Sequence, residues 1–133
     1  MTTVDPVTRL SLDGPDRPGP DGSGVHVLHV RGPLDRAAGA RLLRLADARL
    51  ALVRAGTRHD RHLVVDVSGV TGTDTGGLAA LRHLRFACDR LGIGVHLAGT
   101  DALGHAGAHL GGQLAGFDRY PTAAVAVRAL CAS

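Results

Sequence analysis

Residues 63–81, LVVDVSGVTGTDTGGLAAL, place a β-branched run, a loop of small residues and a helix start in direct succession. Residues 63–67 have the composition of a strand that is buried on both faces, as the central strands of parallel sheets are. Residues 68–77 are predicted to form a loop that delivers the chain to a helix at Leu78. This order predicts an α/β fold with a parallel central strand.

Downstream of this stretch, helical and strand patterns alternate. Apolar residues recur every three or four positions along one face of the helix that begins at Leu78: Leu78, Leu81, Leu84, Cys88 and Leu91. Gly92 is predicted to end this helix. Residues 95–98 then form a second buried strand, and residues 117–120 form a shorter one.

Two further helices are predicted on the C-terminal side. Asp101 is placed to cap a helix, weakened by glycines, that extends through Leu110. Thr122 is the predicted N-cap of a helix over residues 123–131, because Pro121 prevents a helix upstream of it. Strands that alternate with helices in this way support the α/β assignment.

Upstream of the central strand, residues 25–31 (VHVLHVR) alternate as a strand does. Residues 8–12 (TRLSL) are predicted to pair with this strand in antiparallel orientation. Residues 13–24 are so rich in Gly, Pro and Asp that they are predicted to form a flexible loop. Gly32 and Pro33 are expected to break the strand.

A helix over residues 37–54 follows, and Asp35 is placed to cap it. Its predicted buried face consists of Leu42, Leu45, Ala46, Leu50 and Val53. The opposite side carries charges: Arg41, Arg44 and Asp47. An amphipathic helix of this kind is expected to cover one face of the sheet.

At 133 residues, the chain is predicted to form one domain over residues 1–133, with its core in residues 8–131. The hydrophobic share of 44% is mainly Ala, Leu and Val, with two Phe, one Tyr and no Trp. Cys88 and Cys131 are far apart and have no CxxC spacing, so both are predicted to be small buried hydrophobic residues. No apolar run approaches the roughly 20 residues of a membrane-spanning helix, and no secretory signal is visible, so a cytoplasmic location is predicted.

Every basic residue is Arg and every acidic residue is Asp, so the chain has neither Lys nor Glu. Sites that require lysine, including a Walker-type phosphate loop and Schiff-base chemistry, are therefore excluded. The net charge is +3, but the arginines are scattered from Arg9 to Arg128 rather than clustered, and few aromatic residues could stack on bases. No direct nucleic-acid binding is therefore predicted. The composition also fits a high-GC bacterial coding bias.

Candidate catalytic and metal sites find little support in the sequence. His105 and His109 share a helix face at i, i+4 spacing, but no third ligand is placed near them. His59 and His62 are assigned to a polar loop. The loop before Leu78 contains no G-x-S-x-G, and Ser68 is more simply part of a turn. The sequence therefore predicts a binding domain rather than an enzyme, with no metal and no cofactor.

The turn before the Leu78 helix is the main candidate site. Asp74 is predicted at or near the N-cap, where its carboxylate accepts from free backbone N–H groups. Thr75 lies at the exposed rim beside it, and Gly76 and Gly77 leave the backbone open to close approach. A helix N-terminus favours an anion by roughly 0.3–1 kcal/mol. The turn is thus either a binding surface or only a cap followed by a tight glycine turn.

Four landmarks carry a family resemblance: VRGPLD (30–35), LVVDVSGVTGTDTGGLAAL (63–81), VHLAGT (95–100) and FDRYPTAAVAVRAL (117–130). With the order of elements over residues 8–129, they resemble the anti-sigma factor antagonist family, the STAS domain. The resemblance implies a mixed sheet of four or five strands with helices mainly on one face. It also implies a partner, an anti-sigma factor of the serine/threonine kinase type. In the family, that partner binds the turn and the following helix and phosphorylates the turn. Binding sequesters the anti-sigma factor and so frees a sigma factor for transcription.

The resemblance assigns a role to each position of the D-S-S-G-L-type turn, which here reads Asp74, Thr75, Gly76, Gly77 and Leu78. Gly76 stands where the usual phospho-acceptor serine would be. Either Thr75 receives the phosphate instead, or binding is constitutive, or the domain serves another input such as a small ligand or a larger assembly. Constitutive binding or a non-kinase role is the favoured interpretation.

Partner contacts are further predicted along the exposed face of the Leu78 helix, at Arg82 and Arg85. Asp35 lies in the VRGPLD landmark, which in the family sits close to the same end of the fold. For the two arginines the alternative is a solvated helix face, and for Asp35 it is a simple helix cap. A ligand-sensing or scaffold role without kinase switching stays open, as does homodimer formation.

Overall fold

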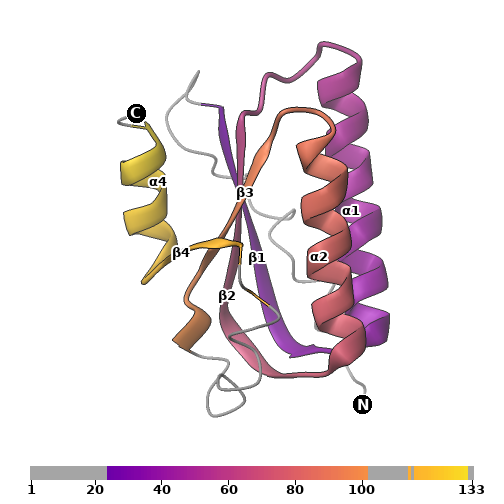
Figure 1. Cartoon of the computed structure of the whole chain (residues 1–133), viewed down its shortest axis with the longest axis vertical. Helices are drawn as coiled ribbons and strands as arrows, with labels where there is room; N and C mark the ends of the chain where they lie inside the picture. Colours follow the sequence, from indigo (N-terminus) through magenta and orange to yellow (C-terminus); the bar gives the residue numbers. More distant parts are fainter. Residues whose placement is uncertain (1–23, 102–113, 115, 132–133) are drawn as a thin grey trace.

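The computed structural model describes residues 24–101, 114 and 116–131 of the chain (Figure 1). Within these residues the elements are β1 (Val25–Leu34), α1 (Arg36–Arg54), β2 (His62–Thr73), α2 (Thr75–Asp89), β3 (Gly94–Ala98), β4 (Asp118–Tyr120) and α4 (Ala123–Cys131). The predicted strand at residues 8–12, nearly all of the loop at residues 13–24, and most of the helix between Asp101 and Leu110 lie outside the described residues. No helix in the described part of the chain is long and apolar enough to cross a membrane.

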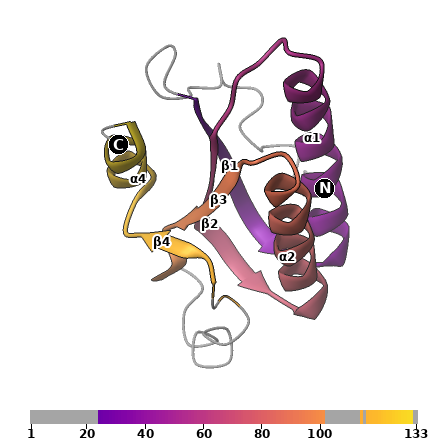
Figure 2. The ribbon, with the colours of Figure 1, turned by 45° about the horizontal axis from the view of Figure 1, so that its top comes forward.

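The four described strands form one sheet in the order β1-β2-β3-β4, and each neighbouring pair is parallel. Helices α1 and α2 lie together on one face, and α4 lies on the other (Figure 2). The fold is therefore the predicted α/β architecture, with helices mainly on one face of the sheet. The antiparallel strand predicted for residues 8–12, which would make the sheet mixed, lies outside the described ranges.

Two apolar clusters fix these layers. The larger one fills the space between the sheet and helices α1 and α2, and includes Leu28, Val65, Leu97, Leu42 and Leu81. The smaller one lies under α4 and consists mainly of Val25, Val27, Val64, Ala98, Ala126 and Leu130. Because β2 contributes buried side chains to both clusters, it is buried on both faces, as the run at residues 63–67 predicts.

The three described helices follow the predicted amphipathic patterns. Leu42, Ala46 and Leu50 of α1 are buried, and Leu45 and Val53 pack against the core at its edge. In α2 four members of the predicted apolar face are buried, namely Leu78, Leu81, Leu84 and Cys88, whereas Leu91 lies just beyond the helix and packs against the core at its edge. In α4, Thr122 caps the helix start as predicted, since its Oγ1 accepts from the Val125 N–H at 3.1 Å.

Two strands are longer than the sequence predicts. β1 continues past Gly32 and Pro33, which were expected to break it, through register shifts at which Gly32 has a positive φ of 79°. Residues 68–73, predicted as loop, continue β2 as far as Thr73. The two strands pair up to Leu34 and Thr73, so ladder hydrogen bonding in the folded protein outweighs the weak strand propensity of these glycines and serine.

Candidate functional site

The starts of α1 and α2 lie side by side at one end of the sheet (Figure 1). This arrangement follows from β-strand register, because Leu34 at the end of β1 pairs with Thr73 at the end of β2. Each strand passes into its helix within one residue, through Asp35 and Asp74 respectively. We call the exposed surface around Asp35, Asp74 and Thr75 the helix-start rim.

Both aspartates of the helix-start rim are N-caps, as predicted. The Asp74 carboxylate accepts from the Gly77 N–H at 2.9 Å, and the Asp35 carboxylate accepts from the Ala38 N–H at 2.9 Å. Each cap has an extended backbone and satisfies one of the free N–H groups at its helix start. Asp35 is therefore a helix cap and also lies at the same end of the sheet as Asp74, so the two interpretations of Asp35 do not exclude each other.

Gly77 packs the start of α2 directly against the end of β1. A Cβ atom at position 77 would overlap the Leu34 carbonyl oxygen, so only glycine allows this approach. The Thr73 hydroxyl donates to the same carbonyl oxygen at 3.0 Å. One carbonyl group thus ties together the end of β1, the end of β2 and the first turn of α2.

Gly76 is confined by the first residue of α1. A Cβ atom at position 76 would lie 2.8 Å from the Arg36 Cβ and 3.0 Å from the Arg36 Cα. Both are atoms at or next to the backbone, so they cannot move aside as the end of a long side chain can. The position that would carry the usual acceptor serine is therefore closed to a side chain unless α1 shifts.

The predicted partner residues divide into exposed and buried groups. Thr75 and Asp74 are exposed, whereas Gly77 is buried and Leu78 is only 5% exposed in the core. Arg82 is exposed on the outer face of α2. A partner can therefore reach the rim and the outer face of α2, but the Leu78 side chain supports the fold.

Arg85 is engaged by the domain itself. It is half-buried, and its guanidinium lies 5.4 Å from the centre of the Phe117 ring. The sequence pattern predicts Arg85 on the exposed face but does not single out two other exposed residues, Arg36 beside Gly76 and Phe86 near the end of α2. Phe86 carried a signal, because it is an aromatic residue that falls outside the apolar face of its helix; Arg36 carried none.

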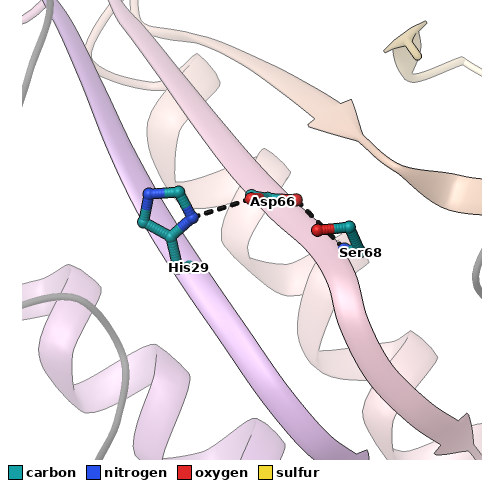
Figure 3. A network of polar contacts seen from close by, with 3 residues as sticks. All are labelled: His29, Asp66 and Ser68. Atoms are coloured by element: carbon teal, nitrogen blue, oxygen red, sulfur yellow. Dashed lines mark hydrogen bonds and ion pairs between the residues drawn. The ribbon is translucent and has the colours of Figure 1, made fainter. Parts of the chain in front are cut away.

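A network of polar contacts between His29, Asp66 and Ser68 joins β1 and β2 on the sheet face that also carries α4 (Figure 3). Asp66 contacts His29 through Oδ2, 2.7 Å from Nδ1, and accepts from the Ser68 N–H at 3.0 Å through Oδ1. The Asp66 side chain is only 13% exposed, and that of His29 is 44% exposed. Asp66 therefore holds the His29 ring and the irregular stretch of β2 together, beside a cavity of about 320 Å³.

His62 belongs to a histidine pair rather than to the predicted polar loop. It is the first residue of β2, and its Nδ1 lies 3.1 Å from Nε2 of His96 on β3. Burial lowers the pKa of both rings; the neighbouring Arg61 charge lowers that of His62 further, and His62 lowers that of His96. The loop prediction failed because the ladder with β3 extends the strand to His62.

No group of three or more metal-ligating side chains occurs in the described part of the chain. His105 and His109 lie outside it. Cys88 is buried, as predicted, whereas Cys131 is only half-buried.

A family model described as the STAS domain matches residues 20–123. A sulfate transporter family protein from Wolinella succinogenes shares 19% identity and a TM-score of 0.64; the match covers 83% of this chain and 89% of that one. A SulP transporter STAS domain from Vibrio cholerae shares 20% identity over 77% of each chain, with a TM-score of 0.56. SLC26A9 is 20% identical in sequence and matches with a TM-score of 0.58; the match covers 82% of this chain and 20% of that one. These likenesses concern the fold, and no curated protein matches the chain.

Proposed function

Because the chain belongs to the STAS domain family, we propose that it acts as an anti-sigma factor antagonist in the bacterial cytoplasm. In this role it is not an enzyme. It binds an anti-sigma factor of the serine/threonine kinase type through the helix-start rim and the outer face of α2, and so releases a sigma factor for transcription. The observation that carries the proposal is the rim itself, where two capped helix starts bring the half-buried Asp35 to the same end of the sheet as the exposed Asp74 and Thr75.

The rim suits a protein partner because its backbone is held on several sides. Gly77 abuts the Leu34 carbonyl group and Gly76 abuts Arg36, so little conformational entropy is lost when the surface is covered. The exposed Arg82 extends the surface along α2. A partner that contacts both areas would use one face of one helix, which is a common form of recognition.

Regulation at this rim differs from the usual family scheme. The crowding of position 76 by Arg36 argues against an acceptor side chain there. Thr75 is exposed at the first position of α2, where a phosphate would add about −1.5 to −2 charge beside Asp74 and repel a bound partner. We favour constitutive binding, with phosphorylation of Thr75 as the switch if one operates.

The second candidate is a ligand-sensing or scaffold domain without kinase switching. Two observations favour it: the crowded Gly76, and the polar cavity beside His29 and Asp66. In this case a small ligand or a larger assembly would take the place of the kinase-type anti-sigma factor. The two candidates differ in the partner that the rim binds, and a binding experiment separates them.

The test uses the full-length protein as bait against lysate of its source bacterium, with mass spectrometry of the partners and of phosphate on Thr75. A recovered anti-sigma factor is then titrated against wild type, Thr75→Asp and Thr57→Asp. Thr57 is also exposed but follows the far end of α1, so it is the matched control. We expect Thr75→Asp to weaken binding by about tenfold or more, because it places a charge in a desolvated contact, and Thr57→Asp to leave it unchanged.

Two results would count against the proposal. Equal affinity of wild type and Thr75→Asp would remove the rim from the interface. Absence of any anti-sigma factor among the partners would favour the ligand-sensing or scaffold alternative.

A further inference from the structure

Phe86 is an aromatic side chain that the core does not use. The chain has only two Phe, one Tyr and no Trp, and yet Phe86 is 61% exposed on α2. The other phenylalanine, Phe117, is 7% exposed. An aromatic ring contributes most when it is covered, so Phe86 adds little to the stability of the described domain.

Phe86 forms one wall of a groove rather than an isolated exposed residue. The groove has a volume of about 420 Å³ and is lined by Arg54, His83, Phe86, Ala87, Arg90 and Leu91. Ala87 and Leu91 are half-buried and pack against the core, so they form an apolar floor. The groove lies where the C-terminal end of α1 meets that of α2, and its size suits one or two inserted side chains.

The polar part of the groove is cationic. Arg54 is in the last turn of α1, and Arg90 is the C-cap of α2, with its guanidinium 5.9 Å from the centre of the Phe86 ring. The described lining contains no carboxylate. Arginines at helix ends are explained by the helix dipole, but that effect does not explain an exposed ring between them.

We propose that this groove, which we call the Phe86 groove, docks a short segment of a partner protein in which an apolar side chain is flanked by carboxylates. The apolar side chain packs on Phe86 and the floor, and the carboxylates pair with Arg54 and Arg90. Aromatic and arginine residues together are the typical anchors of protein interfaces. Charge complementarity therefore selects an acidic segment over a neutral or basic one.

Two other occupants fit the groove less well. A symmetric second copy of the chain would bring Arg54 and Arg90 of one subunit toward the same residues of the other, which repel each other. Single-stranded nucleic acid would need a row of aromatic rings for successive bases, whereas the described lining offers only Phe86 and the smaller imidazole of His83.

The Phe86 groove is independent of the helix-start rim. Thr75 and Phe86 are three helical turns apart on α2, about 16 Å along its axis. A substitution at Thr75 therefore leaves the groove intact. Because the groove is tested with peptides and the rim with an anti-sigma factor, failure of one proposal is distinguishable from failure of the other.

The experiment is a selection of displayed random peptides on the wild-type full chain, with counter-selection on Phe86→Ser. Phe86 is exposed, so the variant is expected to fold, and urea unfolding of both proteins checks this. Selected peptides are synthesised and titrated against wild type, Phe86→Ser, Arg54→Gln and Arg44→Gln. Arg44 is exposed elsewhere on α1 and is the matched control for Arg54.

We expect peptides with an apolar residue flanked by Asp or Glu. Their affinity should fall about tenfold or more in Phe86→Ser and several-fold in Arg54→Gln, while Arg44→Gln and Thr75→Asp leave it unchanged. The inference is overturned if no peptide is enriched, if enriched peptides lack acidic residues, or if they bind Phe86→Ser equally well. A dimer that Phe86→Ser dissociates, or binding of oligo(dT) that it abolishes, would assign the groove to a second copy or to nucleic acid instead.

Discussion

Gly77→Ala is expected to destabilise the domain even though alanine is the better helix former. The new Cβ would overlap the Leu34 carbonyl oxygen, a backbone atom that cannot rotate away. Moving the first turn of α2 to relieve this overlap costs about 3 kcal/mol, the upper part of the overpacking range. Loss of the Thr73–Leu34 hydrogen bond adds about 1 kcal/mol, and better helix propensity returns about 1 kcal/mol. The free energy of unfolding should therefore fall by about 3 kcal/mol.

Urea unfolding followed by circular dichroism measures this change, and thermal unfolding should show a midpoint lower by about 10 °C. Gly72→Ala is the control, because a Cβ at that strand position meets nothing within 4 Å. It should be neutral or stabilising by up to about 0.5–1 kcal/mol. The reasoning is refuted if Gly77→Ala unfolds within about 0.5 kcal/mol of wild type, since the packing of the rim would then not depend on this glycine.

Three further predictions concern the rest of the domain. The pKa values of His62 and His96 are lowered in the folded protein, so the unfolded chain binds more protons below about pH 6.5. The free energy of unfolding should therefore be at its full value above about pH 6.5 and decline below it, and the decline should be smaller in His96→Gln. Urea midpoints measured at several pH values would show this. Asp66→Ala should cost about 1–2 kcal/mol in urea unfolding, and a cost no larger than that of the exposed Asp47→Ala would contradict its role. Burial raises the pKa of Cys88 to about 12, so a thiol reagent at about pH 8 should modify Cys131 in the native protein and Cys88 only after unfolding.

The sequence predicted the helices better than the strands. Apolar spacing and cap residues are local signals, so α2 and its Asp74 cap could be read directly. The end of β2 could not, because residues 68–73 are held as strand by their pairing with β1, a contact between distant parts of the chain.

The candidate site was predicted in position but not in its inner structure. The sequence pattern predicts the two caps and places Thr75 beside Asp74, whereas only the family resemblance places Asp35 at the same end of the fold. That Leu78 is a core residue, and that Arg36 crowds Gly76, depends on how α1 packs against α2. Phe86 became informative only when its neighbours across the groove, including Arg54 from another helix, were known.

The packing that closes position 76 also determines how the rim can be controlled. Gly39 of α1 and Ala80 of α2 meet so closely that a Cβ at position 39 would lie 2.6 Å from the Ala80 Cβ. With Gly76 against Arg36, this contact fixes the two helix starts relative to each other, so the rim is organised before any partner arrives. The partner proposed above would therefore bind this rim without a folding or ordering step, in line with constitutive binding. An input that regulates it must either add charge at the exposed Thr75 or displace α1 from α2, because no side chain can be introduced between them.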